Sequence, residues 1–298
     1  MLKEIRKFIV RALRRWYVPS EEDGNAYIDG RLDFARRLSR PFLHIPCRLF
    51  RQEALAEYIW LWERMTDYSP AHSGVRVSFM VGDIKELING YPRGRLRFEE
   101  IRERVGEKLQ AGHDKNLRYD WIILNGLLDH VDDTLAWFDQ TRDDPEMRGF
   151  LDRVSLLVEP LLLQEERWAD IAFLHPSPVN DLEKKWRMLA WKPEDGGSNP
   201  EYGSRPLDSG MERLVRDFSG MLYASLLHVG REAEAAELVR KARPVLDQKR
   251  LVHELVEMAC RAKCAREEHM AWLDEYHDPD DRSVEDLRAR LVDQLGLI

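Results

Sequence analysis

Residues 211–246, MERLVRDFSGMLYASLLHVGREAEAAELVRKARPVL, predict two helices that fold back on each other. In the first half, apolar residues recur at three- and four-residue steps, the spacing that places side chains on one helical stripe. Gly230 follows this helix, and glycine most readily takes the left-handed conformation that ends one. Ala235 and Ala242 mark the close-packing side of the second helix. Because two helices alone leave faces uncovered, further helix pairs are expected beside them.

This stretch is similar to a tetratricopeptide (TPR) repeat, in which a glycine turn separates two helices and alanines lie where the second packs on the first. The residues that carry the resemblance are Leu226-Leu227, Gly230-Arg231, Ala235-Ala236 and Ala242. The spacing from Ala136 to Ala235 is close to three repeats of about 34 residues each. The resemblance covers about residues 116–276. It implies an all-α, right-handed solenoid of antiparallel helix pairs, with roughly 11 to 13 helices in the chain.

The chain is accordingly expected to have three parts: a basic amphipathic helix at 1–17, a helical region at 18–115 and the repeats at 116–298. Residues 193–210 are rich in Pro, Gly, Ser and Asp, which predicts a flexible loop within the repeats. Ser283 predicts the start of a final helix at 283–296 that covers the end of the array. In the middle region, Asn89-Gly90 before Pro92 predicts a helix end, and the arginines at 93, 95 and 97 predict a basic connector.

Composition limits the class of protein. The chain has 298 residues, of which 44% are hydrophobic and 34% charged, and this balance is typical of a soluble globular protein. Its three cysteines do not form a disulfide framework, so we expect a cytoplasmic protein. The net charge is −8, but residues 1–17 hold six basic residues and one acid, which leaves −13 for the remainder. An acidic body argues against a nucleic-acid partner.

Residues 2–17 place apolar and basic side chains on opposite arcs of a helix. Three interpretations follow. The helix covers the end of the array with its apolar side, lies on an anionic membrane surface with Trp16 at the boundary, or belongs to a targeting peptide. In the membrane interpretation, the basic residues that contact the anionic surface are Lys3, Lys7, Arg11, Arg14 and Arg15.

The sequence contains none of the common catalytic motifs: no P-loop, G-x-G-x-x-G, G-x-S-x-G or H-E-x-x-H is present. His253, Glu257, Cys260 and Cys264 share one helical stripe, but it is about 16 Å long, too long to surround one zinc ion. Asp132-Asp133 and Asn180-Asp181 lack the further ligands of terpene-synthase metal motifs. No cofactor and no metal site are therefore predicted.

The TPR resemblance implies a concave groove, lined by the first helix of each pair, that receives a protein segment. The residues that the repeat alignment places in it are Tyr119, Ile122, His130, Asp217, His228, His253, Glu257, Cys260 and Cys264. We expect His228, His253 and Glu257 at its centre. The predicted function is a non-enzymatic adaptor or assembly scaffold with an unidentified protein partner, or an array that forms homo-oligomers. The alternatives are a helical enzyme, with its site between the N-terminal half and the repeats, and a membrane-peripheral protein.

Overall fold

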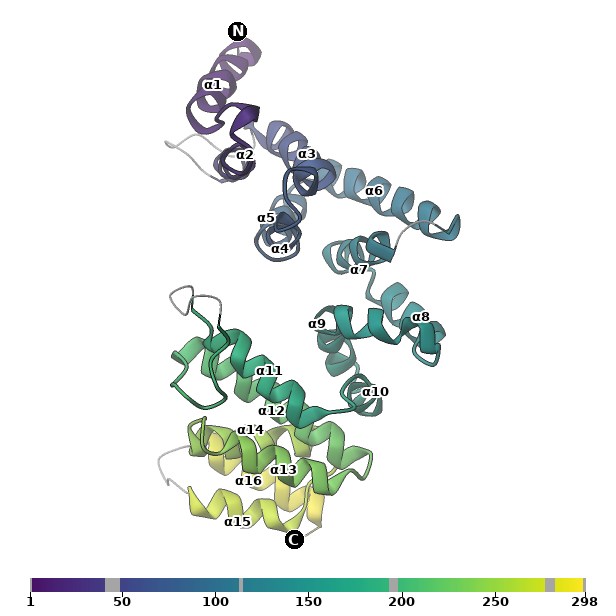
Figure 1. Ribbon diagram of the computed structural model, residues 1–298, viewed down its shortest axis with the longest axis vertical. Coiled ribbons are helices and arrows are strands. Elements are labelled where there is room, and N and C mark those ends of the chain that lie inside the picture. Colours follow the sequence, from purple (N-terminus) through teal and green to yellow (C-terminus); the bar gives the residue numbers. More distant parts are fainter. Residues whose placement is uncertain (1, 41–48, 113–114, 193–197, 277–281, 297–298) are drawn as a thin grey trace. The chain divides into compact units, whose positions relative to one another are not determined.

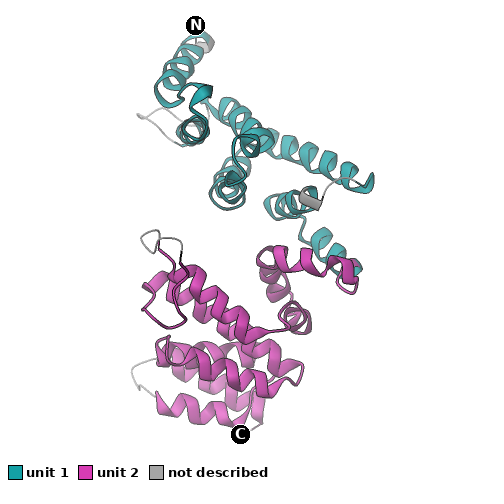
Figure 2. Ribbon diagram, in the orientation of Figure 1, with its two compact units in different colours: residues 1–140 teal, residues 141–298 magenta. Residues whose placement is uncertain are grey.

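The computed structural model describes residues 2–40, 49–112, 115–192, 198–276 and 282–296, without the side chains of residues 2, 3, 115 and 116 (Figure 1). In these residues the chain is helical and contains no strand, which confirms the all-α prediction. The chain divides into two compact units, residues 1–140 and 141–298 (Figure 2). The division falls in the last turn of α8, so residues 116–140 group with the first unit and not with the later helix pairs.

The first unit consists of helices that pack in successive pairs, α2 along α3 and α6 along α7. Its helices are α1 (Leu2–Tyr17), α2 (Asn25–Ser39), α3 (Arg51–Tyr68), α4 (His72–Val75), α5 (Val81–Asn89), α6 (Pro92–Gln110), α7 (Lys115–Leu128) and α8 (Val131–Thr141). A π-helical turn, η3 (Arg76–Met80), joins α4 to α5. Fully buried side chains such as Phe34, Tyr58 and Phe98 form the core between these helices.

The second unit has α12 at its centre, in contact with α10, α11, α13 and α14. Its helices are α9 (Arg148–Gln164), α10 (Trp168–Leu174), α11 (Pro178–Ala190), α12 (Ser209–His228), α13 (Glu232–Ala242), α14 (Gln248–Arg261), α15 (Glu267–Glu275) and α16 (Arg282–Leu295). α12 and α13 are the two helices that residues 211–246 predict, and Gly230 between them has the expected positive φ of 75°. Leu287 and Leu291 of α16 are buried against Val256 and Cys260 of α14.

Buried ion pairs join the helices of the first unit. Glu57 on α3 is 6% exposed and accepts hydrogen bonds from Arg14 (2.7 Å) and Arg31 (2.8 Å). The Arg31 guanidinium also lies 3.4 Å from the centre of the Trp60 ring. Asp83 on α5 is likewise buried, and accepts from Arg36 (2.7 Å) and Arg40 (3.1 Å). These pairs fix α2 to α3 and α5 by charge as well as by apolar contact.

Two predictions about these elements are wrong. The arginines at 93, 95 and 97 do not form a connector, because Pro92 occupies the first turn of α6 and the helix continues through them. The described residues also contain more helices than the roughly 11 to 13 expected from a TPR-like repeat. One reason is the stretch around residues 72–89, where a π-helical turn separates two α-helical segments.

The loop predicted at 193–210 is described from residue 198, and it is irregular up to the cap of α12 at Asp208. Tyr202 attaches this loop to α11 and α13. The Tyr202 hydroxyl donates to the Lys241 carbonyl at 2.9 Å, and its ring packs 5.4 Å from that of Trp186. Residues 193–197 lie outside the described part.

Candidate functional site

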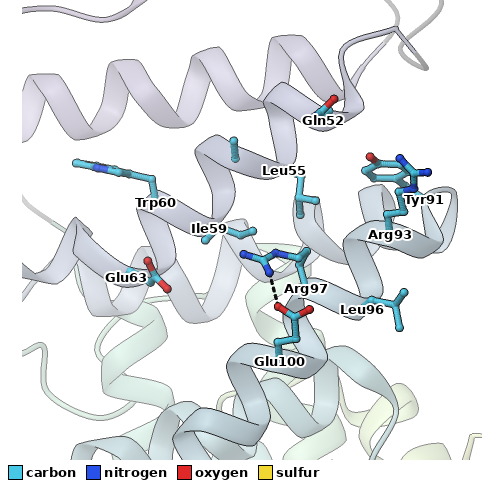
Figure 3. Close-up of a pocket in the computed structure, with 11 residues that line it drawn as sticks. Gln52, Leu55, Ile59, Trp60, Glu63, Tyr91, Arg93, Leu96, Arg97 and Glu100 are labelled. Atoms are coloured by element: carbon cyan, nitrogen blue, oxygen red, sulfur yellow. Dashed lines mark hydrogen bonds and ion pairs between the residues drawn. The ribbon is translucent and has the colours of Figure 1, made fainter.

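A groove of about 640 Å³ lies between α3 and α6 in the first unit (Figure 3). α3 lines it at helical spacing over about three turns, a length of about 16 Å. The lining residues are Gln52, Leu55, Ala56, Ile59, Trp60 and Glu63 of α3, Tyr91 before α6, and Arg93, Leu96, Arg97 and Glu100 of α6. Leu96 lies at the edge of the groove on α6 and is 63% exposed, and Leu55, Ala56 and Ile59 form the aliphatic floor beside it. The groove is therefore an open apolar seam between two helices, bordered by charged residues.

The two helices run in the same direction. Arg51, at the start of α3, donates to the Gly90 carbonyl just before α6, and Glu63 pairs with Arg104 (3.1 Å) further along both helices. One end of the groove thus has two helix N-termini and Arg93, whereas the other has Glu63 and Glu100. Since a helix N-terminus carries a partial positive charge, the groove is electropositive at its Arg93 end.

Neighbouring side chains hold the walls of the groove in place. The Trp60 ring contacts the Arg31 guanidinium and packs edge-on against Tyr27 at 5.8 Å. A Cβ atom on Gly94 would lie 3.3 Å from the Tyr91 ring, so glycine there leaves room for this ring at the end of the groove. The tryptophan wall is therefore set before any partner binds.

The groove predicted from the TPR resemblance is not assembled as expected in the second unit. Cys260 is 3% exposed and packs on α16, and Glu257 is paired with Arg290 of that helix, which holds the pKa of Glu257 below its usual value. Cys264 is half-buried, and burial raises the pKa of its thiol to about 11. The reason for the difference is that α16 covers this stripe at Glu257 and Cys260, while Cys264 lies against the Ala224 carbonyl of α12.

His228 and His253 are not brought together. A Cβ atom on Gly220 of α12 would lie against Glu254 and Met258 of α14, which sets the register of these two helices. His228 lies eight residues beyond Gly220 along α12, about 12 Å further. His253 is next to Glu254 on α14 and lies beside Arg216, which is on the opposite side of Gly220 along α12 from His228. His228 is exposed, whereas Asp217 is half-buried and lies 3.5 Å from Arg213.

The remaining predicted groove residues lie in the first unit. Ile122 is buried at 3% exposure, so it presents no surface to a partner. Tyr119 is half-buried, and burial raises the pKa of its hydroxyl. His130 is half-buried, with Nε2 2.9 Å from a Glu99 carboxylate oxygen. None of these three residues lines the α3–α6 groove.

The predicted anionic contact is partly described. Lys7, Arg11, Arg14 and Arg15 all have exposed positions on α1. The Lys3 side chain lies outside the description. Of the apolar arc of α1, Ile5, Phe8 and Trp16 are exposed, whereas Ile9 and Leu13 are half-buried, so α1 covers its neighbours with only part of that arc.

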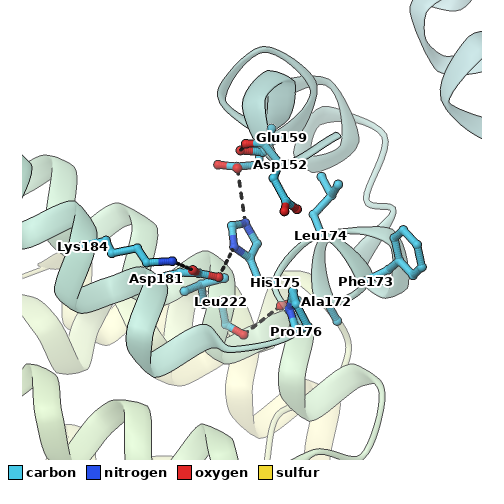
Figure 4. A network of polar contacts seen from close by, with 12 residues as sticks. Asp152, Glu159, Ala172, Phe173, Leu174, His175, Pro176, Asp181, Lys184 and Leu222 are labelled. Carbon is cyan, nitrogen blue, oxygen red and sulfur yellow. Dashed lines mark hydrogen bonds and ion pairs between the residues drawn. The ribbon is translucent and has the colours of Figure 1, made fainter. Parts of the chain in front are cut away.

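A buried ionic cluster in the second unit joins α9 to α11 (Figure 4). His175, after α10, lies 3.2 Å from Glu159 of α9 and 3.1 Å from Asp181 of α11. Burial disfavours a charge on His175, but hydrogen bonding and attraction from Asp181 and Glu159 outweigh it and raise the pKa to about 9. His175 is therefore a cation at neutral pH. A protonated imidazole cannot accept a proton, so the cluster has the properties of a structural ion pair and not of a general base.

His269 is the opposite case. Its Nδ1 accepts the Arg266 backbone N–H at 3.0 Å, so Nε2 carries the proton and donates to the Tyr223 hydroxyl at 2.7 Å. Burial, with a smaller effect of Arg266, lowers the His269 pKa to about 4. This histidine is neutral and fully hydrogen-bonded, which indicates a structural role.

The described residues include no cluster of three or more histidine, cysteine or acidic side chains placed to hold a metal ion. No helix in the described part of the chain has the length and apolar character needed to cross a membrane. Comparison with protein-family models, curated protein sequences and solved structures found no match to the chain.

Proposed function

We propose that the protein is a non-enzymatic adaptor, built from TPR-like helix pairs, that binds an amphipathic helix of a protein partner between α3 and α6. The exposed Leu96 beside an aliphatic floor carries this proposal. Two helical stripes with a gap between them accept a third helix by packing of side-chain ridges into grooves. The α3 wall of the groove, from Gln52 to Glu63, is long enough for about three turns of such a helix, and Leu55, Ala56 and Ile59 provide its aliphatic part.

The charges of the groove favour one direction for the bound helix. Its C-terminus is negative and is attracted to the Arg93 end, while its N-terminus is positive and is attracted to Glu63 and Glu100. The bound helix therefore runs antiparallel to α3 and α6. Acidic residues in its last turn would bind next to Arg93.

The lining argues for binding and against catalysis. Among the described residues that line the groove there is no histidine, cysteine or serine, the side chains that most often act as general base or nucleophile. Both of its glutamates are paired with arginines, Glu63 with Arg104 and Glu100 with Arg97. A paired surface carboxylate serves orientation and specificity better than proton transfer.

A selection from a displayed library of random helical peptides tests the proposal. We expect the full-length protein to enrich peptides with apolar residues at i, i+3, i+4 and i+7. A selected peptide, labelled with fluorescein, should bind Leu96→Glu about 10- to 100-fold more weakly, because a buried leucine contact is lost. Moving its acidic residues from the last to the first turn should weaken binding about two- to fivefold.

The control is Phe79→Glu, which changes an apolar side chain of similar exposure (68%) that does not line the groove. Both variants should melt at the wild-type temperature, because both side chains are exposed. Equal affinity of the peptide for Leu96→Glu and wild type would refute the site. A wild-type dimer that Leu96→Glu dissociates would show instead that a second copy of the chain occupies the groove.

A further inference from the structure

α1 exposes an apolar stripe although neighbouring helices lie beside it. Phe8 is 73% exposed, Trp16 84% and Ile5 49%, and Ala12 lies exposed between them at helical spacing. These four side chains share one side of the helix because they are three or four residues apart. Apolar side chains of this size, exposed in a row, are typical of an interaction surface.

A row of basic side chains borders this stripe. Lys7, Arg11 and Arg15 each precede a member of the stripe by one residue, so the two rows run side by side about 100° apart on the helix. All three are exposed, and Lys7 also pairs with Glu4 at 3.0 Å. Apolar and cationic surface therefore face outward together over about two turns.

The structure holds α1 in this orientation through its opposite edge. Arg6 pairs with Glu53 at 2.9 Å and Arg14 with Glu57 at 2.7 Å, both on α3. Ile9, Val10, Leu13 and Tyr17 form the half-buried side of the helix. At the junction with α2, a Cβ atom on Gly30 would lie 2.4 Å from the Tyr17 carbonyl oxygen, so glycine permits this close approach. Turning the apolar stripe inward would break both ion pairs.

We propose that α1 binds the protein to an anionic lipid bilayer, with Phe8 and Trp16 inserted at the level of the headgroups and acyl chains. An interfacial helix requires such an apolar row for insertion and a basic row for contact with lipid phosphates. Charge complementarity favours an anionic surface over a neutral one, because residues 1–17 carry +5. The remainder of the chain carries −13 and is repelled by that surface, so membrane contact is confined to α1. This proposal is independent of the α3–α6 groove.

Sedimentation with lipid vesicles tests it on the full-length protein. At low ionic strength the wild type should sediment with vesicles of phosphatidylcholine and phosphatidylglycerol, but not with phosphatidylcholine alone. The double variant Arg11→Gln, Arg15→Gln should bind the anionic vesicles about 25-fold more weakly, since each basic residue contributes about fivefold. Phe8→Gln with Trp16→Gln should abolish sedimentation even though all basic residues remain, because the inserted apolar area is lost.

The matched controls are Phe79→Gln and Arg64→Gln, which remove an exposed aromatic and an exposed basic side chain elsewhere in the first unit. Both should sediment as wild type does, and all variants should keep the wild-type melting temperature. Failure of the wild type to sediment with anionic vesicles would overturn the proposal, as would equal sedimentation of the α1 variants. A dimer in light scattering that Phe8→Gln with Trp16→Gln dissociates would also overturn it, in favour of a second copy covering the stripe.

Discussion

Among single residues, His175 links the stability of the second unit to alkaline pH. The imidazolium lies between Glu159 and Asp181 and is joined by the Phe218 ring, 5.3 Å away edge-on. A His pKa of about 9 in the folded chain, against 6.5 for the free side chain, means that folding favours the protonated form. Its contribution is fully present below pH 6.5 and is lost as the pH rises through 9.

We therefore expect His175→Gln to lower the free energy of unfolding by on the order of 3 kcal/mol near pH 6.5, and by much less at alkaline pH. Urea unfolding of both proteins between these limits measures the difference. Other groups titrate in this range too, but they do so in both proteins and cancel. A difference that stays constant with pH would mean that His175 is not a cation in the folded chain.

At the scale of elements, the contact between α12 and α14 depends on a glycine. A Cβ atom at position 220 would lie 2.6 Å from the Glu254 Cγ and 3.1 Å from the Met258 Cγ. Both atoms belong to the middle of half-buried side chains, so these side chains or the helices themselves must shift to admit a methyl group. Glycine at position 220 therefore allows α14 to pack closely on this side of α12.

Gly220→Ala should destabilise the second unit by about 1–3 kcal/mol, the usual range for overpacking. Calorimetry should show a lower melting temperature for its transition. Gly149→Ala in α9 is the control, because a Cβ atom there would meet nothing within 4 Å and alanine is the better helix former. If Gly220→Ala melts no earlier than Gly149→Ala, the two helices are not in close contact at this point.

Local signals in the sequence were enough to predict where helices end. The stop at Asn89-Gly90, the turn at Gly230 and the last helix near Ser283 lie close to the observed boundaries, because capping depends on residues within one turn. Which helix covers which face depends on partners distant in the chain. Nothing around Cys260 indicates that α16 packs on it, and the sequence of α6 does not show that Leu96 stays exposed.

The α3–α6 groove cannot be recognised in the sequence for the same reason. Of the aromatic residues of α3, Tyr58 and Trp62 are buried in the core. Trp60, only two residues from each, borders the groove. The helical spacing of Leu55, Ile59 and Glu63 does indicate a shared side of α3, but this side can be recognised as a groove wall only when the position of α6 is known.

For the whole molecule, the division at residue 140 predicts two cooperative units, each with its own buried core. Residues 141–298 expressed alone should unfold in one transition, with the melting temperature of the corresponding transition in the full chain. Circular dichroism of the fragment and calorimetry of the full chain make the comparison. A fragment that is unfolded, or that melts far below the full chain, would show that the second unit needs the first.

The buried ion pairs of the first unit have a consequence for how the sequence can change over evolution. Loss of Arg31 alone leaves Glu57 buried with one partner fewer, and loss of Asp83 leaves Arg36 and Arg40 with no carboxylate between them. Single substitutions at these positions are costly, whereas replacing a whole set with apolar residues is tolerated. In homologous chains, positions 31 and 57 should therefore covary, as should position 83 with 36 and 40.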